Sequence, residues 1–132
     1  MKTVSKLKSD LDKIFSKYIR LRDSNPDNGF GKCCTCNRIL HWKEGDAGHF
    51  QPRQHNATRY HEQNVNLQCK KCNNKNWNQG EQYLHGKYID RKHGAGTADS
   101  LERLARCIKQ FKPYELEDLI STYKQKLKYL EV

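Results

Sequence analysis

Two Cys-x-x-Cys pairs carry the clearest chemical signal in this sequence. They are Cys33–Cys36 and Cys69–Cys72. Each pair makes a tight turn that points two sulfurs at one centre, and four thiolates complete the tetrahedral shell of a zinc ion. Because no coordination position stays open, such an ion holds structure and performs no catalysis. We therefore predict a structural zinc site formed by these four cysteines.

A disulfide framework is the alternative for the same cysteines. Charged residues make up 30% of the chain, and no segment resembles a secretory signal or approaches the length of a membrane span. These features favour zinc in a reducing, cytoplasmic compartment and argue against a membrane protein. Cys34 and Cys107 are left over. Cys107 falls on an apolar helical pattern, so we expect it to be a small core residue.

Beside the cysteine pairs stand residues suited to hydrolysing a phosphodiester. A neutral imidazole at His49 can take a proton from water near neutral pH, which makes it the candidate general base. A zinc-ligand or surface role is the alternative for His49, although four cysteines already fill the zinc shell. Asn73 directly follows the last cysteine and offers an amide oxygen to a hard cation such as Mg²⁺. The alternative for Asn73 is a helix N-cap.

The charge balance points to a polyanionic partner. The chain has 25 Lys and Arg against 15 Asp and Glu, a formal net charge of +10, and such an excess is typical of proteins that bind nucleic acid. Arg53, Arg59, Lys70 and Lys71 flank the candidate site, and we expect them to contact DNA phosphates without reading sequence. Ordinary solvated charge is the alternative. A ribosomal or architectural protein would share this charge, so charge alone does not identify an enzyme.

A helix over residues 4–22 is the first element expected to support the site. Its apolar residues recur at alternating steps of three and four, as on one helix face. They are Val4, Leu7, Leu11, Ile14, Tyr18 and Leu21. Packing against the zinc core and a dimer seam both remain open for this stripe.

The central segment predicts a small zinc core. Two short strands, residues 38–42 and 46–50, are expected to form a hairpin turned by Lys43-Glu44-Gly45. A loop then leads through Asn64 to the second cysteine pair, and a helix is expected to start at or just before Asn73. Trp77 on that helix is either a core residue or a base-stacking residue.

The C-terminal part predicts further helices. One lies around residues 83–89, and a break follows at 93–97. Asp99 and Glu102 resemble a capping box for a second helix, and Pro113 starts the last one. The second helix presents Leu101, Leu104, Ile108 and Phe111, and the last presents Leu116, Leu119, Tyr123, Leu127 and Leu130. These stripes present more apolar surface than a small zinc module can cover, so we expect a homodimer.

We predict one domain over residues 1–132, with an N-terminal helix in 1–24, a zinc-stapled core in 31–80 and a helical extension in 81–132. The order of motifs resembles the HNH superfamily in its H-N-N form, with His49, Asn64 and Asn73 on the three positions. The closer resemblance is to the bacteriophage NinG/Rap recombination family, over about residues 10–80. It is carried by residues 15–22, the Cys33–Cys36 pair, residues 46–50, Arg59-Tyr60, Asn64 and residues 68–73.

This resemblance implies an α+β fold in which a zinc-bound treble-clef ββα-metal (HNH-like) core carries flanking N- and C-terminal helices. It also implies a metal-dependent endonuclease that hydrolyses phosphodiesters in branched DNA, such as a Holliday junction or a D-loop. Mg²⁺ or Mn²⁺ would be the catalytic ion. DNA and phage or host recombination proteins would be the partners, and the bacterial host cytoplasm would be the location.

Two site residues take their roles from the resemblance. Asn64 stands where the superfamily uses an asparagine to tie the loop to the hairpin and hold the histidine's orientation, with a loop cap as the alternative. The superfamily places a metal-binding aspartate directly before the histidine, where this chain has Gly48. Asp46 is the expected substitute, although a turn role is equally open, and Glu62 is the reserve. Since strand residues alternate faces, Asp46 shares Gly48's face and lies opposite His49's. Two residues of strand displace it by roughly 6–7 Å, so it would need a bend, which Gly48 could permit.

Two functions from different classes follow. The first is an HNH-type endodeoxyribonuclease with His49 as general base. The second is a non-catalytic, zinc-stapled DNA-binding or recombination accessory module, in which Gly48 marks lost activity. The two differ in whether His49 and Asn73 face one another across a gap that fits an ion.

Overall fold

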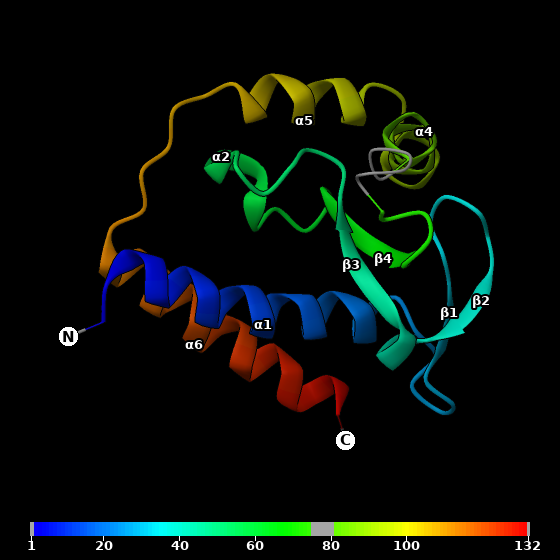
Figure 1. Cartoon of the computed structure of the whole chain (residues 1–132), viewed down its shortest axis with the longest axis horizontal. Coiled ribbons are helices and arrows are strands. Elements are labelled where there is room, and N and C mark those ends of the chain that lie inside the picture. Colours follow the sequence, from blue (N-terminus) through cyan, green and yellow to red (C-terminus); the bar gives the residue numbers. More distant parts are fainter. Residues whose placement is uncertain (1, 75–80, 132) are drawn as a thin grey trace.

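A long N-terminal helix, α1 (Val4–Arg22), lies beside the C-terminal helix α6 (Pro113–Leu130) along one side of the molecule (Figure 1). The computed structural model describes residues 2–74 and 81–131. Helix α1 begins where the Thr3 side chain accepts a hydrogen bond from the Lys6 amide, which caps the first turn. It ends at Asp23, whose backbone N–H donates to Ile19. These bounds agree with the helix predicted over residues 4–22.

The main hydrophobic core lies between α1 and α6. Leu11, Phe15 and Ile19 of α1 are fully buried against Leu116 and other residues of α6. The buried face of α1 therefore passes through Phe15 and Ile19, each one position after a residue of the predicted stripe (Ile14 and Tyr18). Because α6 covers α1 within one chain, the apolar excess that suggested a homodimer is largely accounted for. The homodimer stays a prediction.

Two small antiparallel sheets lie next to this helix pair. Strand β1 (Phe30–Lys32) pairs with β2 (Ile39–His41), and β3 (Gly45–His49) pairs with β4 (Val65–Cys69). The predicted hairpin between residues 38–42 and 46–50 is therefore wrong. A short 3-10 helix, η1 (Trp42–Glu44), separates the two strands and sends them into different sheets. The segment Lys43-Glu44-Gly45 does not form the type I′ or II′ turn that connects the strands of a tight hairpin.

The remaining described helices are α2 (Asn56–Arg59), α4 (Gln82–His93) and α5 (Thr97–Ala105), and α5 lies on the side of the molecule away from α1 and α6 (Figure 1). The break between α4 and α5 falls at Gly94 and Gly96, both with positive φ. The predicted cap by Asp99 is replaced by Asp90 of α4, whose carboxylate accepts from the Ala98 amide at 2.9 Å.

Helix α5 ends earlier than its apolar pattern predicts. The amides of Arg106 and Cys107 donate to the carbonyls three residues back, which closes the helix with tighter turns. The chain then crosses toward α6 (Figure 1). Ile108 is consequently 96% exposed, and Cys107 is exposed as well. The prediction that Cys107 is a core residue is therefore wrong.

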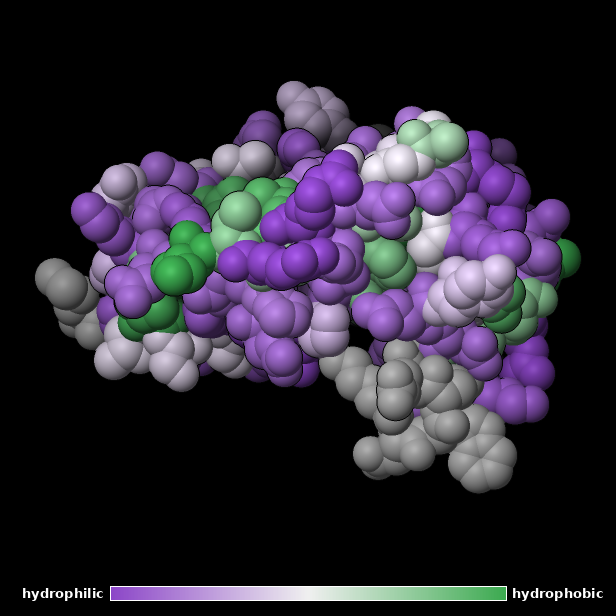
Figure 2. Space-filling view, turned by 90° about the horizontal axis from the view of Figure 1, so that it is seen from above, coloured by the Kyte–Doolittle hydropathy of each residue, from purple (hydrophilic) through white to green (hydrophobic). Residues whose placement is uncertain are grey.

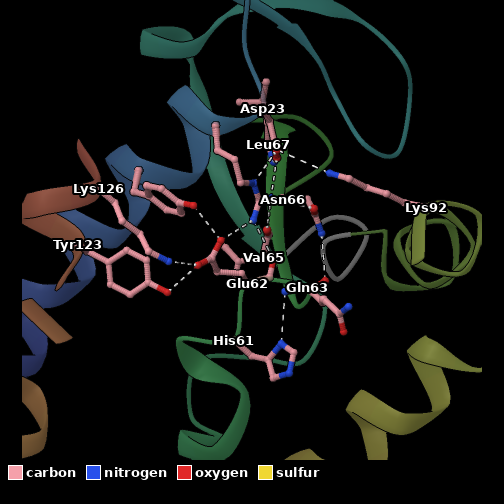
Figure 3. Close-up of polar contacts among 12 residues, drawn as sticks. Asp23, His61, Glu62, Gln63, Val65, Asn66, Leu67, Lys92, Tyr123 and Lys126 are labelled. Carbon is pink, nitrogen blue, oxygen red and sulfur yellow. Dashed lines mark hydrogen bonds and ion pairs between the residues drawn. The ribbon is translucent and has the colours of Figure 1, made fainter. Parts of the chain in front are cut away.

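Glu62 joins the helix pair to the segment that leads into β4 (Figure 3). Its carboxylate accepts hydrogen bonds from Tyr18 at 2.9 Å, Tyr123 at 3.0 Å and Lys126 at 2.8 Å. Burial raises the pKa of Glu62, but these three donors outweigh it and hold the pKa below its ordinary value. Arg22 adds hydrogen bonds to the carbonyls of Glu62 and Val65. Helices α1 and α6 are thereby fixed to the strand that ends in the second cysteine pair.

On the other side of β4, a buried histidine connects the strand to α4. His85 is fully buried, and its Nε2 accepts from the Asn66 amide nitrogen at 3.0 Å. Burial lowers the pKa of His85 to about 4, so the ring is neutral near pH 7. Asn66 also accepts from Arg22 at 3.1 Å. One polar chain thus runs from α1 through β4 to α4.

The described helices include none that is both long and apolar enough to cross a membrane. The face shown in Figure 2 is largely hydrophilic, with small, separate hydrophobic patches. The helix predicted from Asn73 falls largely on residues 75–80, which lie outside the described residues, and so does Trp77. Asn73 itself lies in a turn. The structure is a mixed α+β fold, and its assignment as a treble clef stays a prediction.

Candidate functional site

Four cysteine sulfurs converge where the turn after β1 meets the end of β4. The Sγ atoms of Cys33, Cys36, Cys69 and Cys72 all lie within 4.8 Å of one another, and those of Cys36 and Cys69 are 3.8 Å apart. In a tetrahedral zinc site with Zn–S bonds of about 2.3 Å, neighbouring sulfurs are separated by about 3.8 Å. The donor set and its spacing therefore fit zinc, and these four cysteines could hold the predicted ion.

The electrostatics of the cluster also suit a cation. Burial raises the pKa of Cys33, but hydrogen bonds from the Thr35 hydroxyl and from backbone amides bring it down to about 6. At Cys72 burial dominates and raises the pKa to about 12. Four thiolates in one place therefore need a metal ion to compensate their charge.

Cys34 lies outside the cluster. It is buried, and burial raises the pKa of its thiol. Its backbone amide donates a hydrogen bond to the Leu67 carbonyl.

A pocket of about 430 Å³ opens between α1, β3 and Asn73. Three of the four predicted catalytic residues line it, namely Asp46, His49 and Asn73. The other lining residues are Asp12, Phe15, Ser16, Ala47 and Arg53. The structure thus brings His49 and Asn73 to one cavity, as the endonuclease prediction requires.

The orientation of His49 suits a general base. Its Nε2 lies 3.0 Å from the carbonyl oxygen of Arg59. A carbonyl can only accept, so Nε2 carries the hydrogen and Nδ1 carries the lone pair. The hydrogen bond to Arg59 would also stabilise an imidazolium if Nδ1 took a proton.

Asn64 holds the loop that provides this carbonyl. It is fully buried, its Nδ2 donates to the carbonyls of Gln51 and Thr58 at 3.1 Å each, and its Oδ1 accepts from the Gln51 amide at 2.8 Å. Thr58 immediately precedes Arg59, so Asn64 fixes the backbone that holds the His49 ring. The predicted loop tie is present in these contacts, and Asn64 does not line the pocket.

Replacing Asn64 with alanine is expected to destabilise the fold by about 2–4 kcal/mol, because three buried backbone groups lose their partner. The measurement is the free energy of unfolding in urea for the zinc-loaded protein. Asn56→Ala is the matched control, since the Asn56 side chain makes one partly buried bond, to the Lys109 carbonyl. A loss at Asn64 no larger than the loss at Asn56 would contradict the loop-tie role.

Asp46 and Asn73 contact one another at the pocket. Asn73 Nδ2 donates to Asp46 Oδ2 at 3.1 Å, and Lys70 Nζ lies 2.8 Å from Asp46 Oδ1. A rotation of the Asn73 amide would turn its oxygen toward the same point, and carboxylate and amide oxygens are ligands that Mg²⁺ and Mn²⁺ accept. The pair therefore fits part of a divalent-ion site.

The bend expected at Gly48, to compensate for the displacement of Asp46 along the strand, is absent. Strand β3 pairs without interruption from Gly45 opposite Cys69 to His49 opposite Val65. The pocket is instead bordered by both faces of the strand, Asp46 from one face and His49 from the other. Both residues therefore border the pocket without any bend in β3.

Gly48 has a steric reason of its own. A Cβ atom built there would lie 2.1 Å from Oε1 of Gln68, which occupies the space beside it. An aspartate at position 48 would therefore require Gln68 to move. Glycine at position 48, where the superfamily has aspartate, therefore goes together with the position of the Gln68 side chain on the neighbouring strand β4.

Asp12 is a pocket residue that sequence reasoning missed. Its carboxylate accepts from both Nε and Nη2 of Arg59, and from the Tyr60 hydroxyl at 2.8 Å. Asp12 thereby holds the residue whose carbonyl binds His49. The available signal was an acidic residue in a basic helix, three positions before the Phe15 stretch that carries the family resemblance.

The four predicted DNA-binding residues are placed differently. Arg53 is exposed and lines the pocket, with Nη1 3.6 Å from Asp12. The Arg59 guanidinium is mostly buried against Asp12, which leaves it poorly placed for a phosphate. Lys70 is exposed and pairs with Asp46, and Lys71 is exposed beside it. Their DNA contacts stay predictions. The reserve ligand Glu62 points toward α1 and α6 and does not line the pocket (Figure 3).

One family model matches the chain. It is described as NinG, bacteriophage lambda NinG protein, and it covers residues 1–132. No curated protein and no solved structure matches.

Proposed function

The chain belongs to the bacteriophage lambda NinG family, and from this premise we propose that it is a metal-dependent DNA endonuclease of phage recombination that cuts branched DNA, such as a Holliday junction or a D-loop. The observation that carries the proposal is that His49, Asp46 and Asn73 line the same pocket. A proton acceptor and oxygen ligands for a divalent ion are the groups that phosphodiester hydrolysis needs.

His49 acts first. Its Nδ1 accepts a proton from a water molecule, and the resulting hydroxide attacks the phosphorus atom. The Arg59 carbonyl, 3.0 Å from Nε2, keeps the ring in the tautomer that can accept this proton. Asn64 and Asp12 hold Arg59 from its backbone and its side chain, so the ring is oriented before DNA arrives.

Asp46 and Asn73 are the proposed ligands of the catalytic ion, Mg²⁺ or Mn²⁺. An ion held by these two residues would supply positive charge to the phosphate under attack and to the departing 3′ oxygen. Lys70 neutralises Asp46 in the observed structure, through a pair in which the lysine side chain is 68% exposed. Exposed pairs of this kind are weak, and the lysine can exchange its partner for a DNA phosphate.

The zinc cluster supports the same pocket. Cys69 ends β4, the strand paired with β3, and Cys72 directly precedes Asn73. An ion held by these cysteines would fix Asn73 relative to Asp46. The structural metal and the proposed catalytic residues thus depend on one short segment of chain.

A non-catalytic DNA-binding or recombination accessory module is the second candidate. The observation that favours it is Gly48, where the superfamily has a metal-binding aspartate and where Gln68 fills the space. In that case the net charge of +10 would provide DNA binding, and the pocket would lack a sufficient metal ligand set.

Nicking of end-labelled four-way junction and of matched duplex DNA tests the proposal. We expect the wild-type chain to cut the junction with Mg²⁺ or Mn²⁺, and to cut the duplex much less. The divalent ion is omitted in the control and not chelated, because a chelator would also remove structural zinc. Binding to the junction without cleavage in either ion would replace the nuclease proposal with the accessory module.

A further inference from the structure

A second cluster of residues outside the pocket combines aromatic rings with positive charge. It consists of Phe30, His41, Trp42, Lys17, Arg20 and Lys43, and we refer to it as the Trp42 surface. The rings of His41 and Trp42 are stacked at 5.9 Å, and Phe30 meets His41 edge-on at 5.3 Å. Phe30 is 45% exposed. Three aromatic rings therefore form one continuous step across β1, β2 and η1.

Three cations surround the Trp42 ring. The Arg20 guanidinium carbon lies 5.2 Å from the ring centre, Lys43 Nζ 5.7 Å and Lys17 Nζ 5.9 Å. Lys17 pairs with Glu131. Within residues 2–74 and 81–131, neither Arg20 nor Lys43 takes part in an ion pair. Two of the three cations at this surface therefore keep positive charge without a carboxylate partner among the described residues, and a polyanion would be attracted to it.

The local backbone holds this surface in place. The Trp42 amide donates to the Gly29 carbonyl at 2.9 Å, and Arg20 Nη1 donates to the Trp42 carbonyl at 3.2 Å. Gly29 has φ of 77°, and a Cβ atom there would lie 2.5 Å from Nε2 of His41. The loop therefore closes directly beneath the His41 ring. The rings need little ordering when a ligand binds.

The Trp42 surface adjoins the candidate pocket. Ser16 lines the pocket, and Arg20, one turn further along α1, donates to the Ser16 hydroxyl at 3.2 Å. On the other side, η1 leads directly into β3, which carries Asp46. A nucleic acid strand that leaves the pocket along α1 would meet these rings and cations.

We propose that the Trp42 surface binds a single-stranded DNA segment, with an unpaired base on the aromatic step and its phosphates on Lys17, Arg20 and Lys43. Bases in a duplex are already stacked on one another, whereas an unpaired base offers its face to an aromatic side chain. The inference rests on the proposed function in taking DNA as the ligand. It assigns a binding surface to the unpaired nucleotides that branched DNA such as a D-loop contains.

Binding of labelled oligothymidylate and of duplex DNA of equal length, followed by fluorescence anisotropy without added divalent ions, tests this inference. Trp42→Leu keeps apolar bulk but removes the π face, and we expect it to weaken single-strand binding at least about five-fold. Duplex binding should change less than about two-fold, since phosphate contacts dominate it. Trp42→Phe should retain most of the single-strand affinity.

Tyr83→Leu is the matched control. Tyr83 is 73% exposed on α4 and has Lys87 Nζ 4.9 Å from its ring centre, so it is an aromatic and cation pair on another element. This change should leave single-strand binding unaltered.

Tryptophan fluorescence provides a second measurement. In a Trp77→Phe background Trp42 is the one tryptophan, and its fluorescence should be quenched as oligothymidylate binds.

Lys43→Gln covers the case in which Trp42→Leu fails to fold, because Lys43 is exposed. We expect it to weaken single-strand binding by a few-fold and to reduce its salt dependence. Equal losses for single-stranded and duplex DNA, or no loss in either Trp42→Leu or Lys43→Gln, would overturn the inference. Loss of single-strand binding in a protein that cuts no DNA would support this surface and reject the nuclease, because the assay includes no cleavage.

Discussion

His49→Ala is expected to reduce divalent-ion-dependent cleavage of branched DNA by about 10²- to 10⁴-fold, the usual contribution of a positioned general base. The reason is geometric. His49 lines the pocket with Asp46 and Asn73, and its Nε2 is committed to the Arg59 carbonyl, which assigns the proton-accepting role to Nδ1. Initial cleavage rates of a labelled four-way junction in Mg²⁺ and in Mn²⁺ provide the measurement.

His55→Ala is the control for this change, because His55 lies six residues further along the chain, just before α2, and does not line the pocket. It should cleave like the wild type. The His49→Ala protein should retain its zinc and its junction affinity, because the four cysteines and the exposed basic residues Arg53, Lys70 and Lys71 are unchanged. A His49→Ala protein that cleaves within about three-fold of the wild-type rate would exclude His49 as the base.

The helices were the most predictable part of the fold. Helix α1 combines a strong apolar period with Thr3 at its start, and α6 has Pro113 in its first turn, so local sequence sets their bounds. Strand pairing was predicted less well because it depends on distant partners. Strand β3 pairs with residues 65–69 and not with its neighbour in sequence. No local pattern in Asp46–His49 specifies that choice.

In the candidate site too, features set by local sequence were predicted, and features set by distant contacts were not. Cys-x-x-Cys spacing located the four-cysteine cluster that could hold a metal ion, and the resemblance selected His49, Asn64 and Asn73. Asp12 was missed, because its contact with Arg59 joins residues 47 positions apart. The position of Asp46 was judged from strand alternation and from its displacement along the strand, neither of which includes the shape of a pocket that both faces of β3 border. Contacts between elements, rather than residue types, decided these points.

Cys72→Ser is expected to abolish stoichiometric zinc binding and to lower the free energy of unfolding by at least about 3 kcal/mol. The cost follows from the coupling of metal binding to folding, which in small zinc domains amounts to about 10–16 kcal/mol of binding free energy. A smaller effect is expected here because the core between α1 and α6 contains none of the four cysteines. Zinc content by elemental analysis and unfolding in urea provide the two measurements.

Cys107→Ser is the matched control, since Cys107 is exposed and lies outside the cluster. It should keep both its bound zinc and its free energy of unfolding.

The cluster also has a consequence for the pocket, because Cys72 precedes Asn73 and Asn73 contacts Asp46 at 3.1 Å. Cys72→Ser should therefore also remove cleavage, whereas His49→Ala removes cleavage and leaves zinc in place. If Cys72→Ser retained a full equivalent of zinc and wild-type stability, the four cysteines would not form the structural metal site, and the link from metal to Asn73 would fail with it.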